Sequence, residues 1–256
     1  MKMSIKSILL HAFLLIIAVG MIFPMFWMFL LSIKQYPEGF SSLSTILALP
    51  TTLANYTDTL QSDRFDLYFL NSLFVAVSVT IGNIIFCTFT GYALARREFK
   101  FNKIIFFTIL GVLVIPPHIV MIPLYRLMVE FGWINSYLSL IIPWMVTPFG
   151  VFLVKQYIES MPADMESSAR IDGAGEWYIL FRIVMPLSKP ILTVLGIYTF
   201  LSNWNSFLFP FLFTNDAQYR TLPVGLTFYL GKQSVDWGHL MAGARISALP
   251  VLILFI

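Results

Sequence analysis

The chain offers few side chains that could perform catalysis or hold a metal ion. Its histidines are far apart in the sequence and its one cysteine lies inside an apolar run: His11, His118, His239 and Cys87. This spacing fits neither a metal site nor a set of catalytic residues. The ATP-binding pattern G-x-x-x-x-G-K-S/T is also missing, because Gly231-Lys232-Gln233 lacks the final hydroxyl residue. We therefore expect no catalytic residue, cofactor or metal in this chain, which disfavours a membrane-embedded enzyme.

The polar run best suited to bind a small molecule is Asn203-Trp204-Asn205-Ser206, inside an apolar segment. Side-chain amides and an indole ring suit a sugar, which offers hydroxyl groups and an apolar ring face. His118, which follows two prolines, is a further candidate for the wall of a polar cavity. A structural interpretation stays open for both: polar residues that join helices, and a histidine bonded to a carbonyl that the prolines leave free.

The longest polar-rich run between two apolar blocks is residues 160–190, SMPADMESSARIDGAGEWYILFRIVMPLSKP. It predicts two short helices joined by a hinge at Gly173, because only glycine enters the left-handed region cheaply. Pro162 suits the first turn of the first helix, where its missing N–H costs nothing. The second helix is expected to have one apolar face, formed by Trp177, Leu180, Phe181 and Val184.

This run resembles the cytoplasmic "EAA" signature of permease subunits in bacterial ABC importers, E-A-A-x-x-x-G, nine residues, then I-x-L-P. Nine residues separate Gly173 from Ile183, as in the signature. Ser167 and Ser168 stand where the signature has glutamate and its first alanine, and Met185 replaces the leucine. Three further segments extend the resemblance, which is closest to the carbohydrate-uptake group: Phe69–Ser72, Ile122–Tyr125 and Trp204-Asn205.

The resemblance implies an all-α membrane protein with the ABC importer type I permease fold and a cytoplasmic coupling helix. It implies four kinds of partner: a second permease, two ATPase subunits that use ATP, an extracytoplasmic solute-binding protein and a carbohydrate or related solute. The residues expected to contact the ATPase are Met165, Glu166, Ser167, Ser168, Ala169, Asp172 and Gly173. A solvated loop with ordinary helix caps is the plainer alternative for this stretch.

The composition by itself indicates a multi-pass membrane protein. Of the 256 residues, 58% are hydrophobic and only 11% are charged, whereas soluble domains are nearer a quarter charged. Six apolar segments are long enough to cross a bilayer. They are Ile8–Leu31, Leu67–Ala93, Ile104–Leu124, Tyr137–Tyr157, Ile191–Phe213 and a last one from Leu240 to Ile256, and prolines interrupt the third and fourth.

The basic residues orient these six predicted spans. Ten of them fall on one side: Lys2, Lys6, Arg96, Arg97, Lys100, Lys103, Lys155, Arg170, Arg182 and Lys189. Five fall on the other: Lys34, Arg64, Arg126, Arg220 and Lys232. Since cytoplasmic loops carry the excess of bases, we expect the N-terminus and residues 160–190 on the cytoplasmic side of a bacterial inner membrane. These bases are then topology signals and not a nucleic-acid site, while the direction of Arg245 in the last span stays open.

The acidic residues argue against the alternative function, a stand-alone secondary carrier. All 13 acids map to loops or span edges, whereas ion-coupled carriers usually keep an ionisable group inside the membrane. Backbone carbonyls can bind sodium, so the alternative is not excluded. The sequence does not name the sugar.

Two regions are expected along the chain. Residues 1–66 form an N-terminal span with an extracytoplasmic loop, and residues 67–256 form the ABC transporter type-1 transmembrane domain. The apolar run that ends at Ile256 has no basic flank, so we expect the last helix to be truncated here and a short basic cytoplasmic tail to follow.

Overall fold

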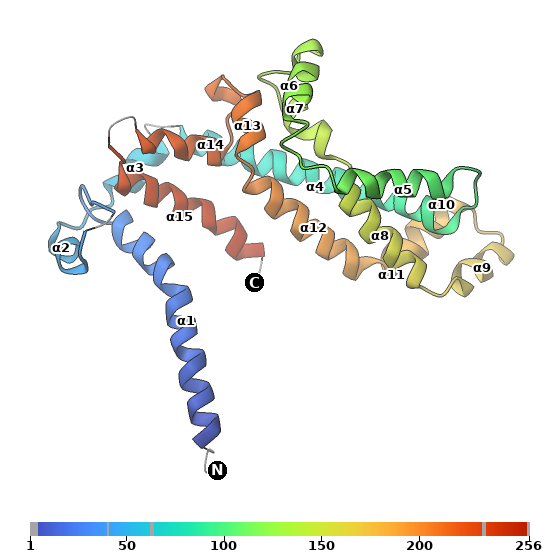
Figure 1. The fold of residues 1–256 in the computed structure, drawn as a ribbon, viewed down its shortest axis with the longest axis horizontal. Coiled ribbons are helices and arrows are strands. Elements are labelled where there is room, and N and C mark those ends of the chain that lie inside the picture. The colour runs from blue at the N-terminus through green and yellow to red at the C-terminus, as the bar shows by residue number, and fades with distance from the viewer. Residues whose placement is uncertain (1–4, 40, 62–63, 232–233, 255–256) are drawn as a thin grey trace. The chain divides into compact units, whose positions relative to one another are not determined.

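The computed structural model describes residues 5–39, 41–61, 64–231 and 234–254, and Figure 1 shows their course. The described residues form helices and turns without a β-strand, and the one isolated bridge pairs Lys34 with Thr51. The expected all-α class is therefore confirmed. The chain divides into two compact units, one made of Met1–Phe69 with Leu222–Ile256, the other of Leu70–Thr221.

The first unit joins the beginning of the chain to its end. Helix α1 runs along α15, and α3 also packs against α15. Lys34 is buried, and its Nζ donates to the carbonyl oxygens of Leu47 (3.2 Å) and Leu49 (2.8 Å), at the end of α2. A lysine at this end satisfies carbonyls that a helix leaves unpaired. The elements are α1 (Ile5–Ser32), α2 (Leu43–Ala48), α3 (Ala54–Gln61), α14 (Leu222–Leu226), η4 (Thr227–Leu230) and α15 (Trp237–Leu254).

Arg245 in α15 turns toward α1 and α3 of the same unit, which answers the open question of its direction. Its Nη1 donates to the Tyr56 hydroxyl at 3.2 Å, and its Cζ lies 4.1 Å from the centre of the Phe29 ring. An arginine stacked on an aromatic ring gains a cation–π attraction that grows as water is excluded. Arg245 thus joins three helices.

The second unit is built along α4, whose first residues belong to the first unit. Helix α8 packs against α5 and α12 (Figure 1). A Cβ added at Gly150 of α8 would lie 2.7 Å from the Cys87 sulfur of α4, so only glycine allows this approach. The elements are α4 (Phe65–Arg96), α5 (Asn102–Leu113), α6 (Met121–Glu130), α7 (Tyr137–Ile141), η1 (Ile142–Trp144), α8 (Pro148–Ser160), α9 (Asp164–Ile171), α10 (Glu176–Ile179), η2 (Leu180–Val184), α11 (Met185–Leu187), α12 (Lys189–Trp204), α13 (Leu208–Phe213) and η3 (Ala217–Tyr219).

The predicted count of six spans is not confirmed. Among the described residues four helices are long and apolar enough to cross a membrane, or five if Glu176–Leu187 and Lys189–Trp204, bent by 77°, form one span. The third predicted span is not one helix, because α5 ends at Leu113 before Pro116-Pro117 and α6 begins only at Met121. The fifth ends early, at Trp204, and α13 follows after a break.

The fourth span, α7 to α8, is broken at Pro148, and Asn83 of α4 repairs the break. In a regular helix the N–H of residue 148 would bond to the carbonyl of residue 144, but proline has no N–H. The buried Asn83 amide donates to that Trp144 carbonyl instead, at 3.1 Å. It also donates to the Thr147 hydroxyl at 3.2 Å, while its Oδ1 accepts from Thr199 of α12 at 3.5 Å. One side chain therefore holds three helices together inside an apolar core.

Candidate functional site

Helix α9 ends at Ile171 and the chain reverses tightly at Gly173, which confirms the predicted pair of helices with a hinge. Gly173 has φ +85°. Its N–H donates to the Arg170 carbonyl at 3.1 Å, and the Ala174 N–H donates to the Ala169 carbonyl at 2.9 Å. These two bonds form a Schellman cap, which requires the left-handed region at this position. The position of Pro162 differs from the prediction, since α9 begins at Asp164 and Pro162 therefore lies before the first turn of the helix.

The four apolar residues expected on one face of the second helix differ in how deeply they are buried. Leu180 and Val184 are buried, but Trp177 is 67% and Phe181 48% exposed. Residues Leu180–Val184 form a π-helical turn, which is wider than an α-helical turn and shifts the register of the side chains. Trp177 and Phe181 instead pack edge-on against Phe89 of α4.

Glu166 fixes α9 to the end of α4. Its side chain is 3% exposed, and its Oε1 accepts from Arg96 Nε at 2.8 Å. Arg96 Nη2 also donates to the Met161 carbonyl at 2.8 Å. We expected Glu166 to bind basic groups of a partner protein. Its carboxylate instead points into its own chain, because Arg96 lies on the inner side of α9. Glu166 thus anchors α9 to α4.

Arg170 extends this ion pair to the second helix. Its Nη2 lies 3.6 Å from Glu166 Oε2, and its Nε donates to Glu176 Oε1 at 3.0 Å. The hydrogen bond to Glu176 raises the pKa of the Arg170 guanidinium. Arg97 also pairs with Glu176. Charges on α4, α9 and α10 therefore form one connected network that holds the two short helices at a fixed angle.

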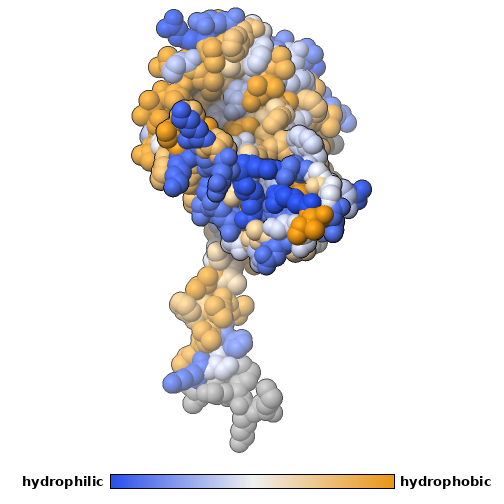
Figure 2. Space-filling model, turned by 90° about the vertical axis from the view of Figure 1, so that its right-hand side faces the viewer, coloured by the Kyte–Doolittle hydropathy of each residue, from blue (hydrophilic) through white to orange (hydrophobic). Residues whose placement is uncertain are grey.

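The outer face of α9 combines small, polar and apolar side chains. Of the seven residues predicted to contact an ATPase, five are exposed and Ala169 and Glu166 turn inward; the exposed ones are Met165, Ser167, Ser168, Asp172 and Gly173. Ile171, which the sequence analysis overlooked, is 86% exposed. A large apolar side chain at the end of a helix that is mostly polar is the signal that could have revealed it. Figure 2 looks onto this end of the second unit, where hydrophobic surface lies beside a hydrophilic area.

A cavity of about 350 Å³ lies within the second unit beside α12. Two of the predicted solute residues, Asn203 and Ser206, line it. The lining contains aromatic rings, hydroxyls and an amide but no charged side chain; it consists of Leu113, Pro117, Trp144, Thr147, Pro148, Phe149, Tyr198, Thr199, Ser202, Asn203, Ser206 and Phe209. Such a wall suits a neutral solute with hydroxyl groups and an apolar face.

The other predicted solute residues lie elsewhere. Trp204 is buried, 2% exposed, and stacks on Phe200 with ring centres 5.7 Å apart. Trp204 was expected to border the solute path. It is instead the last residue of α12 and packs in the interior on the buried side of that helix. Asn205 is exposed and its Nδ2 donates to the Leu201 carbonyl at 2.9 Å. His118 is exposed in the turn between α5 and α6 and does not line the cavity.

Residues 83–256 match the model of a protein family described as the binding-protein-dependent transport system inner membrane component. The chain belongs to this family. It is thus a permease, a multi-pass component of the inner membrane. The match covers the end of α4, the cavity beside α12 and all of α9.

Curated relatives and solved structures agree with this assignment. The arabinooligosaccharides transport system permease protein AraQ of Bacillus subtilis is 33% identical over 258 residues, covering 100% of this chain and 92% of that protein. The trehalose/maltose transport system permease protein MalG of Thermococcus litoralis is 31% identical, covering 98% and 91%. A chain of a bacterial ABC transporter that imports the acidic polysaccharide alginate superposes with a TM-score of 0.86 at 22% identity, covering 100% and 97%, which shows a shared fold.

Proposed function

We propose that this permease forms half of the translocation path of an ATP-driven importer for a carbohydrate. It works with a second permease, two ATPase subunits and an extracytoplasmic solute-binding protein, and it has no ATPase site of its own. The named substrates of its relatives, arabinooligosaccharides and trehalose or maltose, support a sugar. A similar chain was solved in an alginate transporter with its periplasmic protein, which supports the assembly.

The observation that carries this proposal is the arrangement of α9. Its inner side is fixed to α4 by the buried Arg96–Glu166 pair, and its outer side presents exposed apolar residues, Met165 and Ile171. A helix that is firmly mounted on one side and apolar on the other can transmit force from a partner. We infer that α9 is the coupling helix: ATP binding closes the ATPase dimer, α9 moves with it, and the cavity changes the side to which it opens.

The proposal is tested by reconstituting the permease with its partner subunits in vesicles. We expect co-purification with an ATPase and solute uptake that requires ATP. Uptake by the permease alone, driven by an ion gradient and independent of any ATPase, would instead establish the secondary carrier. The solute itself is identified by a binding screen on the cognate solute-binding protein.

Cysteine labelling tests the orientation of the chain. Single cysteines at Ser167 and Gln218, both exposed in the structure, would lie on opposite sides of the membrane. Because the ten-to-five distribution of bases predicts that α9 lies in the cytoplasm, we expect an impermeant thiol reagent to label Gln218→Cys but not Ser167→Cys in intact cells. Permeabilised cells serve as the control, since both should then react; labelling of Ser167→Cys in intact cells would invert the proposed topology.

Gly173→Val is expected to uncouple the membrane-spanning helices from the ATPase. A Cβ at this position meets no atom within 4 Å, so the cost is backbone strain at φ +85° and not a clash. For a β-branched residue that strain is on the order of 1–3 kcal/mol, enough to open the cap behind α9. Solute-stimulated ATP hydrolysis in reconstituted complexes should fall while the helices still insert.

The matched control is Gly173→Asn, because asparagine tolerates the left-handed region. We expect Gly173→Asn to retain most of the stimulation. If the valine variant keeps wild-type stimulation and uptake together, α9 is not the coupling helix.

A further inference from the structure

The loop between α4 and α5, residues 97–101, carries a charge that the fold does not use. Arg96, the last residue of α4, is paired with Glu166, and Arg97, the first residue of the loop, is paired with Glu176. Within the described part of the chain, Lys100 and Lys103 have no ion pair, and Lys100 lies only loosely over the Phe101 ring, at 5.5 Å from its centre. The two arginines therefore form ion pairs within the chain, whereas the two lysines are available to bind a partner.

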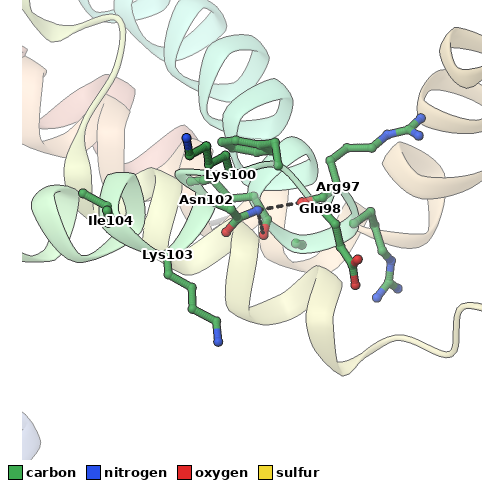
Figure 3. Close-up of a pocket in the computed structure, with 10 residues that line it drawn as sticks. Arg97, Glu98, Lys100, Asn102, Lys103 and Ile104 are labelled. Atoms are coloured by element: carbon green, nitrogen blue, oxygen red, sulfur yellow. Dashed lines mark hydrogen bonds between the residues drawn. The ribbon is translucent and has the colours of Figure 1, made fainter.

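The shape of this loop is fixed from within. The Asn102 side chain donates to the Leu94 carbonyl at 3.1 Å and to the Arg97 carbonyl at 2.7 Å. The turn that these bonds fix borders an open surface hollow of about 750 Å³, lined by residues 94–100 and 102–104. Figure 3 shows Lys100 and Lys103 on either side of Asn102, with their ammonium groups extended away from the loop. The Asn102 hydrogen bonds thus hold the turn in a conformation that directs both lysines to the surface.

The surroundings of the loop are those of a bilayer surface. It follows the span α4 directly, and the helix after it exposes large apolar side chains, with Ile104 62% and Phe107 66% exposed. Phe99 and Phe101 in the loop are also exposed. Aromatic and basic residues together at the end of a span are typical of the headgroup region. The first turn of α5 lacks a side-chain cap, so its N–H groups add a partial positive charge.

We propose that this loop binds the headgroups of anionic phospholipids, with Lys100 and Lys103 contacting the phosphate and Phe99 and Phe101 inserted toward the acyl chains. Glu98 lines the same hollow and opposes the binding. Lipid suits the loop better than a protein surface because the exposed residues on both sides of the lysines are apolar. The chemistry differs from that of the solute cavity, and the inference does not depend on which solute is carried.

Photocrosslinking in the complete transport complex tests this inference. The complex is reconstituted in phosphatidylcholine vesicles that contain a photoactivatable phosphatidylglycerol, and labelled peptides are mapped by mass spectrometry. We expect labelling of residues 97–104, competed by unlabelled phosphatidylglycerol but not by phosphatidylcholine or inorganic phosphate. Near an anionic surface each lysine accounts for roughly a fivefold change in affinity, so K100Q with K103Q should weaken competition by roughly 25-fold.

Two further variants set the direction of the effect. Glu98→Gln removes the opposing charge and should strengthen labelling, whereas Arg126→Gln, an exposed base in α6, should leave it unchanged. Equal labelling in K100Q/K103Q and wild type would overturn the proposal, and so would competition by phosphate alone. Labelling that appears only when the ATPase subunits are removed would also overturn it, and would assign the loop to a protein partner.

Discussion

Replacing Arg96 with methionine is expected to cost this permease about 3–5 kcal/mol of stability and to abolish solute-stimulated ATP hydrolysis. The substitution leaves the Glu166 carboxylate, 3% exposed, without its partner at 2.8 Å. The Arg170 guanidinium at 3.6 Å remains, so the carboxylate is not wholly isolated, but its main charge-assisted hydrogen bond is lost. Helix α9 would then lose its mounting on α4. Thermal unfolding of the purified complex and its ATPase activity measure the two effects.

The neighbouring arginine supplies the matched control. Arg97 pairs with Glu176, but both side chains are 41% exposed, and exposed ion pairs contribute about 1 kcal/mol or less. Arg97→Met should therefore change stability little. The double variant Arg96→Met/Glu166→Met removes both buried charges and should recover much of the lost stability. Equal losses in Arg96→Met and Arg97→Met would contradict the buried anchor.

Trp204→Ala is expected to lower stability by an amount on the order of 3–5 kcal/mol, as for other large aromatic residues in cores. The indole is 2% exposed and stacked on Phe200, so its removal leaves a cavity inside the second unit. Because Trp204 does not line the solute cavity, uptake per correctly folded complex should be nearly normal. Melting temperature and uptake, normalised to the amount of assembled complex, measure the two quantities.

Trp177→Ala is the comparison for this prediction, since it deletes the same side chain at a position that is 67% exposed. Its loss should be about 1 kcal/mol or less, from the contact with Phe89. A Trp204→Ala complex with an unchanged melting temperature and a raised KM for uptake would return Trp204 to the solute path.

Features that depend on neighbouring residues were predictable from the sequence. The left-handed turn at Gly173 follows from glycine itself, and the long helices α1 and α4 follow from uninterrupted apolar runs. The family resemblance depended on the same local spacing and was confirmed. The lengths of the third and fifth spans were wrong, because the pattern shows where apolar residues stand but not where a helix stops within them.

Features that depend on distant residues were not predictable. The direction of Glu166 is set by Arg96, which lies 70 positions earlier. The uneven burial of the apolar residues in the second short helix was not predictable, and neither was the π-helical turn at Leu180–Val184, because the ordinary helical period does not include such a turn. Trp204 looked like a solute ligand by composition, yet packing against Phe200 decides its place.

The amide of Asn83 and the ring of Pro148 also constrain how this permease can change over evolution. A lineage that loses Asn83 first leaves the Trp144 carbonyl without a donor, surrounded by apolar helices. A lineage that loses Pro148 first gains a backbone N–H at that position, which can bond to the Trp144 carbonyl once Thr147 leaves its extended conformation, and Asn83 keeps its contact with Thr147. The two positions are therefore epistatic although 64 residues lie between them, and the tolerated order of substitution begins at residue 148.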